Sequence, residues 1–425
     1  MRLASIDPRR TVDVLDLNQY VTGVAGLARL LESGVDFAQL CQRLESRGRG
    51  NPPDANALLD LSTLLLMTPI PENRAFAFKM QQQALELRQV YHLRPSAAAA
   101  TLRLLVLMAP GDMTANTPVD CLLEDTDVEI TMLYVLPGHP LPAALPDHDL
   151  VFVAIGESEQ GQLLLRQLDG LSKLSGKPVL NSPDRIRLLT RDRISALLRS
   201  VPGAVMPATA RVDRASLLAL AQGEAAVSSL LDAGRFPIIV RPVASHGGKN
   251  LAKIDNAADL AAYVAGLAER EFYLSNYIDY RSSDGQFRKY RLAMFAGRSF
   301  ACHMAISSHW MIHYFNADMT GSEAKRREEE QFMSNFEHSF AQTHEQGLAS
   351  IFRSLGLDFI VLDCGETQEG KLLLFEVDTA AIVHALDDPE LFPYKRAQMR
   401  KLFSAFREML QARARLGARA QIPTK

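Results

Sequence analysis

Three carboxylates stand inside two apolar segments near the end of the chain. Residues 359–366 read FIVLDCGE and residues 372–378 read LLLFEVD, and these segments carry Asp363, Glu376 and Asp378. Both segments have the composition of buried strands, where an unpaired carboxylate is costly. Acids in such places must pair with a cation or ligate a metal ion.

A hairpin turn between the two segments sets the spacing of the acids. Glu369-Gly370 is a suitable two-residue turn, because glycine accepts positive φ. In that register Asp363 lies directly opposite Glu376, with Cβ atoms about 5 Å apart, and Asp378 shares the face of Glu376. Like charges so close need a counter-charge, and three hard oxygen ligands predict a Mg²⁺ site. The alternatives are solvent-facing edge residues, or an acid that pairs with an arginine.

A second candidate site is the loop ASHGGKNL, residues 244–251, between two strand-like runs. Its small, polar and basic residues are Ser245, His246, Gly247, Gly248 and Lys249. The glycines let backbone N–H groups approach an anion, and Arg241 adds a cation just before the loop. Neither GxxxxGK[ST] nor a dinucleotide fingerprint is present. The pattern indicates a phosphate-binding loop, with an ordinary β-hairpin turn as the alternative.

The composition is that of an ordinary globular protein. The chain has 425 residues, 47% hydrophobic and 22% charged, with a net charge of −3. This charge does not predict a nucleic-acid partner. A membrane partner is not expected either, because the sequence has no run of 18 apolar residues. The four cysteines form no CxxC pair, the first residues lack the apolar core of a signal peptide, and no long apolar run occurs. We therefore expect a cytoplasmic protein.

The pattern along the chain predicts an α/β (α+β) protein with three domains. Residues 1–97 are expected to form a helical domain, faintly repeat-like, with helices over 17–34, 54–67 and 72–93. Residues 98–186 alternate short apolar runs with helical stretches, which predicts a parallel sheet covered by helices. Residues 187–425 form the third domain, with a glycine-loop lobe at about 205–275, a metal-binding lobe at about 276–390 and a closing helix.

The order of these segments resembles that of the ATP-grasp superfamily of carboxylate–amine ligases. The matching segments are KPVLNSP (177–183), TRDRISALLRSVPGAVMPATARV (190–212), FPIIVRPVASHGGKNLAKI (236–254), FYLSNYID (272–279), RKYRLAMFAGRSF (288–300) and the D-x12-E-x-D pattern of residues 363–378. No single motif is decisive, but several in the right order are specific. The resemblance covers roughly residues 101–385, and implies an ATP-grasp fold behind a nucleotide-fold-like domain.

The resemblance also implies roles for individual residues. Arg193 and Arg241 match positions where the family usually has phosphate-binding lysines, and residues 245–249 match its glycine-loop clamp. Asn276, Tyr277 and Ile278 match the adenine hinge, mainly through backbone groups. Arg291 matches the catalytic arginine that faces the γ-phosphate and the reacting carboxylate. Asp363 and Glu376 match two metal ligands, and Asp378 stands where the family usually has asparagine.

The activity that the resemblance implies is an ATP-dependent ligation. A carboxylate substrate becomes an acyl phosphate, and an amine then displaces the phosphate, with ATP and Mg²⁺ (or Mn²⁺) as cofactors. A small-molecule kinase and a non-catalytic nucleotide-binding scaffold are the alternatives. Three roles are open for the helical domain: it packs against the rest of the chain, it forms a homo-oligomer, or it binds a partner protein. We interpret His303, His309, His313 and His384 as structural or pocket-lining residues rather than zinc ligands.

Overall fold

The computed structural model describes residues 19–68, 70–93, 100–243, 245 and 247–420. His246 therefore lies outside the described residues. The chain divides into two compact units: unit 1 comprises residues 1–154, 170–179 and 410–425, and unit 2 comprises residues 155–169 and 180–409. Among the described helices, none combines the length and the apolar character needed to cross a membrane.

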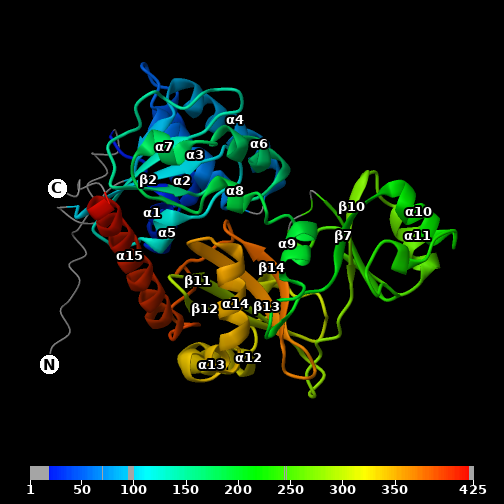
Figure 1. The fold of residues 1–425 in the computed structure, drawn as a ribbon. Coiled ribbons are helices and arrows are strands. Elements are labelled where there is room, and N and C mark those ends of the chain that lie inside the picture. Colours follow the sequence, from blue (N-terminus) through cyan, green and yellow to red (C-terminus); the bar gives the residue numbers. More distant parts are fainter. Residues whose placement is uncertain (1–18, 69, 94–99, 244, 246, 421–425) are drawn as a thin grey trace. The chain divides into compact units, whose positions relative to one another are not determined.

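The first part of unit 1 is helical, as predicted. Its helices are α1 (Gly23–Glu32), α2 (Phe37–Gly48), α3 (Ala55–Leu66) and α4 (Pro71–Leu87), all labelled in Figure 1. Asp36 and Asp54 cap the N-termini of α2 and α3. The side chain of Asp36 accepts a hydrogen bond from one backbone N–H group of the first turn, and that of Asp54 accepts from two. Nearly every side chain of α3 is buried, so this helix is the centre of the helical layer.

The predicted helix over 72–93 is too long. The helix α4 ends at Leu87, and residues 90–92 form strand β1 (Val90–His92) instead. Valine and tyrosine favour extended backbone, and β1 pairs antiparallel with a neighbouring strand. Tyr91 is buried, and its hydroxyl donates a hydrogen bond to the carbonyl of Ala84 at 2.7 Å. This contact ties the strand to the helix before it.

A five-stranded sheet follows the helices, in the order β1-β3-β2-β4-β5. Its further strands are β2 (Leu102–Met108), β3 (Val128–Tyr134), β4 (Leu150–Val153) and β5 (Val179–Leu180), and the short helices of this region are α5 (Val119–Leu122) and α7 (Leu171–Ser175). The strand β2 runs parallel to both β3 and β4. The parallel arrangement predicted from the alternating pattern is confirmed, and β1 adds an antiparallel edge.

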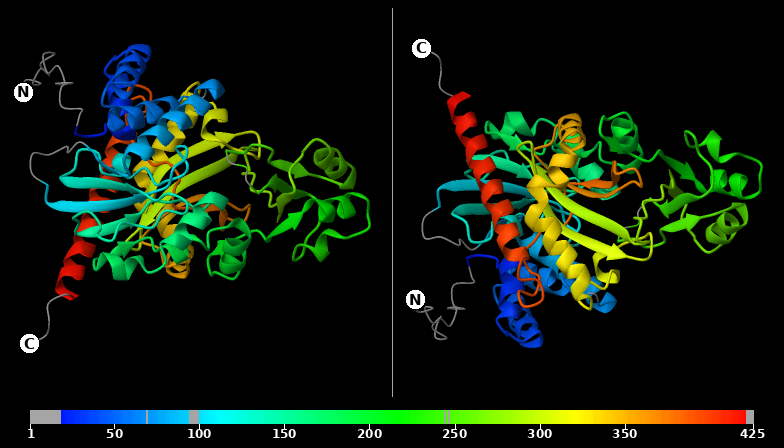
Figure 2. Two further views of the ribbon diagram at one scale, coloured as in Figure 1. Left: turned by 90° about the horizontal axis from the view of Figure 1, so that it is seen from above. Right: turned by 90° about the horizontal axis from the view of Figure 1, so that it is seen from below.

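Unit 2 contains a four-stranded antiparallel sheet in the order β7-β10-β8-β9. Its elements are β7 (Thr209–Asp213), α10 (Arg214–Ala221), η2 (Val227–Ser229), β8 (Ile238–Pro242), β9 (Ala252–Ile254), α11 (Ala257–Ala265) and β10 (Glu271–Asn276). The helices α10 and α11, green in Figure 2, supply Leu217 and Leu260 to one apolar core with Ile238, Val240 and Phe272 of the strands.

The larger sheet of unit 2 has the order β12-β11-β13-β14-β6. Its strands are β6 (Ala204–Val205), β11 (Phe287–Phe295), β12 (Arg298–Ser307), β13 (Phe359–Glu366) and β14 (Leu372–Asp378). The remaining elements are α6 (Glu159–Gln167), α8 (Pro183–Ile186), α9 (Arg191–Leu198), η3 (Tyr314–Asn316), α12 (Glu323–Asn335), η4 (Phe336–His338), α13 (Phe340–Thr343), α14 (Glu345–Leu355) and α15 (Lys395–Ala420). All strand pairs are antiparallel except β14 with β6. Phe406 of α15 packs edge-on against Phe295 and Phe359 of the sheet.

The β13–β14 hairpin has the predicted pairing but not the predicted turn. Asp363 lies opposite Glu376, as expected. The prediction of a two-residue turn is wrong, because the backbone N–H of Thr367 bonds to the carbonyl of Lys371 and three residues lie between them. Gly370 in that loop has φ +73°, which glycine adopts readily. A bulge at Asp363/Cys364 offsets the extra loop residue, so the two acids still face each other.

Replacing Asn181 by alanine is expected to lower the free energy of unfolding by about 3 kcal/mol. Asn181 is fully buried, and its Oδ1 accepts hydrogen bonds from the backbone N–H groups of Asp358 (2.9 Å) and Phe359 (2.8 Å). Its Nδ2 donates to the carbonyl of Phe359 at 2.9 Å, and its φ of +53° suits asparagine better than alanine. Urea unfolding monitored by circular dichroism measures the loss.

The matched control for this variant is Asn335→Ala. Asn335 is exposed, and its side chain makes a single hydrogen bond, to the carbonyl of Gln331. We expect a change within about 0.5 kcal/mol for this surface substitution. Equal unfolding midpoints for the two variants would contradict the role assigned to Asn181.

Candidate functional site

Four side chains form a line across four strands of the larger sheet of unit 2. His303 on β12 pairs with Arg291 on β11, Arg291 pairs with Asp363 on β13, and Asp363 pairs with Glu376 on β14. Directly opposite residues of neighbouring strands project from the same face of a sheet. We call these four residues the cross-strand row.

Asp363 is the most tightly held member of the row. Its side chain is 6% exposed, and Arg291 donates from Nε to Oδ1 at 2.8 Å and from Nη2 to Oδ2 at 3.0 Å. The Nζ atom of Lys289 lies 2.7 Å from Oδ2. Burial alone would raise the pKa of Asp363, but the charges of Arg291 and Lys289 outweigh it and hold the pKa well below its usual range. Asp363 is therefore a permanent anion between two cations.

Sequence reasoning missed Lys289, although a signal for it exists. Lys289 stands two residues before Arg291 on β11, so both side chains project from the same face. A basic residue at that spacing from the expected catalytic arginine is a reason to include it.

Glu376 is paired with Arg191, the first residue of α9. Burial acts to raise the pKa of Glu376, but the charge of Arg191 lowers it below its ordinary value. The structure does not bring the predicted Arg193 to this place. Arg193 is exposed, and its Nη1 donates to the carbonyl of Arg187 at 3.3 Å. Two residues along a helix turn a side chain through about 200°, so Arg191 and Arg193 point in opposite directions.

Arg241 adds a second cation beside Glu376. It is buried at the end of β8, where its guanidinium donates to the hydroxyl of Ser245 at 3.1 Å and also to the carbonyl of Ser245. Burial and the nearby charge of Arg191 lower the pKa of Arg241 to about 10, and Glu376 partly counters this shift. Two arginines close to one glutamate leave a surplus of positive charge that suits an anion.

Part of the loop after β8 is exposed to solvent. Ser245 is buried against Arg241, while Gly247 and Lys249 are exposed. Gly247 and Gly248 have φ +61° and +77°, a region that L side chains rarely adopt. A Cβ on Gly248 would lie 3.2 Å from the sulfur of Met311. Both glycines therefore have a conformational reason to be glycine, which fits an anion-binding turn as well as a simple hairpin turn.

The residues predicted as an adenine hinge lie together at the end of β10. The backbone N–H of Asn276 bonds to the carbonyl of Ala208 and its side chain donates to the carbonyl of Asp232, each at 3.0 Å. The ring of Tyr277 lies 4.8 Å from the Nζ atom of Lys253, while Ile278 is partly buried. Because the backbone N–H and the side-chain amide of Asn276 already donate hydrogen bonds, the backbone groups left for a ligand belong to the residues that follow it.

Asp378 lies on the same face of β14 as Glu376. Burial and the charge of Glu376 raise the pKa of Asp378 to about 6, and the backbone N–H of Ala380 donates to its Oδ1 at 2.8 Å. Within the described residues, no three His, Cys, Asp or Glu side chains are gathered as a metal site, since Asp363 turns toward Arg291 and Lys289. The donor chemistry still fits Mg²⁺, because a divalent cation at Glu376 and Asp378 removes their repulsion.

The other histidines weighed in the sequence have separate environments. The backbone N–H of Met311 donates to Nδ1 of His309 at 3.2 Å, and that of Leu386 donates to Nδ1 of His384 at 3.1 Å. His313 is partly buried, and both burial and the charge of Lys289 lower its pKa. His303 belongs to the cross-strand row.

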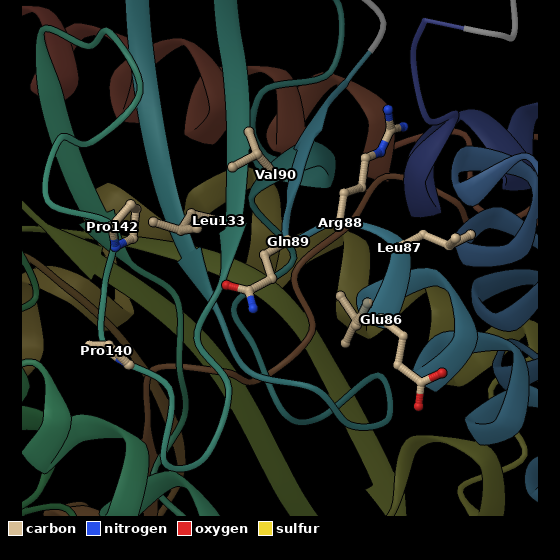
Figure 3. Close-up of a pocket in the computed structure, with 9 residues that line it drawn as sticks. Glu86, Leu87, Arg88, Gln89, Val90, Leu133, Pro140 and Pro142 are labelled. Carbon is tan, nitrogen blue, oxygen red and sulfur yellow. The ribbon is translucent and has the colours of Figure 1, made fainter.

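Unit 1 has a pocket of its own, about 420 Å³ in volume (Figure 3). It lies where α4 leads into β1, beside β3, and includes none of the site residues predicted from the sequence. Its lining residues are Leu85, Glu86, Leu87, Arg88, Gln89, Val90, Leu133, Pro140 and Pro142. The lining is mainly apolar and brings no set of reactive groups together.

Comparison with known proteins finds structural likeness without sequence relatives. No family model and no curated protein matches the sequence. The VanG D-Ala:D-Ser ligase from Enterococcus faecalis matches 71% of this chain and 99% of its own, with 15% identity and a TM-score of 0.43. The D-alanine–D-alanine ligase from Bacillus anthracis complexed with ATP matches 74% and 98%, with 15% identity and a TM-score of 0.41.

A third match is a RimK domain ATP-grasp protein from Sphaerobacter thermophilus. It covers 72% of this chain and 98% of its own, with 19% identity and a TM-score of 0.41. Identities and scores this low transfer no activity to this chain.

Replacing Asp378 by asparagine should stabilise the protein above pH 6 but not below about pH 4, when EDTA keeps metal away. The pKa of Asp378 is raised to about 6 in the folded protein and is about 4 in the unfolded chain. At pH values between these two pKa values, the carboxyl of Asp378 is protonated in the folded protein but ionised in the unfolded chain. The stability of the wild type should therefore fall as the pH rises from about 4 to 6 and then stay level.

Asparagine does not titrate, so the variant should lack this fall. Urea midpoints of both proteins between about pH 3.5 and 8 measure the difference. A difference that stays constant across this range would contradict the raised pKa.

Proposed function

We propose that this protein is an ATP- and Mg²⁺-dependent ligase that joins a carboxylate to an amine through an acyl phosphate. The observation that carries the proposal is the cross-strand row, in which Asp363 is paired with Arg291 and Glu376 is paired with Arg191. Each pair has a second cation beside it, which gives the row two separate positively charged places. The reaction needs two such places, one for phosphates and one for a carboxylate.

The residues that we assign to the phosphates are Arg191, Arg241 and the described loop residues Ser245 and 247–249. Arg191 and Arg241 come from different elements, α9 and β8. Burial lowers the pKa of Arg241, and the nearby charge of Arg191 lowers it further. Guanidinium groups bind phosphate oxygens in a fork geometry, and the glycines let the backbone N–H groups come close. We assign the ring of Tyr277 and the backbone after Asn276 to the base of the nucleotide.

The carboxylate groups of Glu376, Asp378 and Asp363 would hold the metal ion. Mg²⁺ held by these carboxylates would neutralise negative charge that develops during phosphoryl transfer. Glu376 and Asp378 are the better candidates for metal ligands, because both oxygens of Asp363 already accept from Arg291 and Lys289. The role of Asp363 is then mainly to fix those two cations.

The carboxylate substrate would bind at Arg291 and Lys289. Their two positive charges face the single negative charge of Asp363, so one charge is left for an incoming anion. The same cations stabilise the acyl phosphate and the tetrahedral intermediate, in which negative charge grows on oxygen. Exclusion of water by the described loop residues Ser245 and 247–249 would protect the acyl phosphate from hydrolysis.

Arg191→Met should weaken binding of a non-hydrolysable ATP analogue at least tenfold, which is the loss expected for one charge-assisted hydrogen bond. Arg193→Met should leave the affinity within about twofold, because Arg193 is exposed and points away from Glu376. Isothermal titration with Mg²⁺ present measures both. The reverse order of effects would show that the family's usual position applies and that the contact of Arg191 with Glu376 is structural.

Glu376→Gln should remove most of the gain in ATP affinity that Mg²⁺ provides, a loss of about tenfold. Asp378→Asn should retain part of the gain, because an amide oxygen still ligates Mg²⁺. The exposed Glu330→Gln serves as the control. Wild-type binding that is the same with and without Mg²⁺ would refute the metal assignment.

Turnover distinguishes the ligase from its closest alternative. Wild-type protein is incubated with ATP, Mg²⁺ and pairs of amino acids, and the products are identified by mass spectrometry. ADP together with an amide supports the ligase. A stable phosphorylated product without an amide would instead identify a small-molecule kinase.

A further inference from the structure

His303 occupies the end of the cross-strand row, next to Arg291. Its Nδ1 atom is buried and has no hydrogen-bond partner among the described residues. An unpaired polar atom inside a protein costs free energy, and such an atom next to reactive groups indicates a ligand that completes it.

The imidazole of His303 is held in place by a buried network. The ring of Tyr314 packs edge-on against it, with ring centroids 4.8 Å apart. The hydroxyl of Tyr314 accepts a hydrogen bond from Lys395 and lies 3.3 Å from Oε2 of Glu329, which is fully buried. Tyr394 donates to the same Oε2 at 2.6 Å. Several buried polar groups therefore fix the ring of Tyr314, which packs against His303.

The imidazole is neutral at physiological pH. Burial lowers the pKa of His303 well below its ordinary value, and the charge of Arg291 lowers it further. A neutral imidazole offers one lone pair. Lys289 and Arg291 are donors only, and both oxygens of Asp363 accept from them. The imidazole is therefore the acceptor left at this end of the row.

We propose that His303 binds and orients the amine substrate by accepting a hydrogen bond from its N–H group at Nδ1. The inference rests on the proposed function. With the phosphates at Glu376 and the carboxylate at Arg291, the amine must approach from the side opposite the phosphates, where His303 lies. No alternative acceptor in the row is available there, and the fixed ring selects the direction from which the nitrogen comes.

The test compares two substitutions that move an amide to different atoms of the imidazole. Asparagine places its amide near the position of Nδ1, whereas glutamine places it near Nε2. Hydroxylamine serves as the amine, the common amino acids as carboxylates, and the hydroxamate is measured. His303→Gln should raise the KM for hydroxylamine about tenfold, the effect of one lost hydrogen bond, and leave the KM for ATP unchanged. His303→Asn should stay within about threefold, and the exposed His338→Asn should match wild type.

Equal effects of His303→Asn and His303→Gln would overturn the proposal, as would an equal rise in the KM for ATP. Such results would mean that His303 only fills space in the sheet.

A binding measurement tests the role of His303 even if no carboxylate substrate turns over. The protein is labelled with ¹⁵N-histidine, and imidazole nitrogen signals are recorded with Mg²⁺ and a non-hydrolysable ATP analogue before and after addition of hydroxylamine. His303→Asn identifies the signal. A shift confined to Nδ1 of His303 supports the proposal, and an unchanged signal overturns it. Failure of the ATP analogue to bind would instead refute the proposed function itself, which keeps the two outcomes distinct.

Discussion

The ion cluster of Asp363 with Arg291 and Lys289 is the interaction on which the site depends. A buried carboxylate costs several kcal/mol unless cations compensate it. Here two cations surround one anion, and all three side chains project from the same face of the larger sheet. The cluster is therefore positive overall, and the rigid strands prevent the cations from moving away. A surplus charge that is fixed in this way binds anions without reorganising.

The register between β13 and β14 places Glu376 next to this cluster. A slip of one residue between β13 and β14 would turn every side chain of one strand to the other face. The hairpin loop contains three residues, and the bulge at Asp363/Cys364 restores the alignment of Glu376 with Asp363. The bulge thus lies where the register must be correct, next to the acids themselves. Such irregularities are typical of sites where a strand must aim a side chain.

Charge varies systematically along the cross-strand row. Glu376 is flanked by Arg191 and Arg241, Asp363 by Arg291 and Lys289, and His303 beyond Arg291 is neutral. Two cationic places followed by a neutral acceptor correspond to phosphate, carboxylate and amine, in the order in which the proposed reaction uses them. Asp378 differs from these acids, since burial and the charge of Glu376 raise its pKa although the charge of Arg291 opposes the rise. The repulsion from Glu376 is the physical reason for proposing a metal ion beside it.

The sequence by itself determined the local features of this protein. Short apolar runs that alternate with helical stretches predicted the strands and the parallel sheet of unit 1. The pairing of Asp363 with Glu376 was predicted from a two-residue turn, and the structure reaches the same pairing with a three-residue loop and a bulge. The sequence also indicated an ATP-grasp resemblance from the order of short motifs.

Only the tertiary structure decided which charges meet. It brought Arg191 rather than Arg193 to Glu376 and added Lys289 to Asp363. It also left Nδ1 of His303 without a hydrogen-bond partner in the part of the chain that the structure describes. The periodicity of a helix or strand says which residues lie on one face. It cannot say which face meets a distant segment, because that depends on packing between elements that are far apart in the chain.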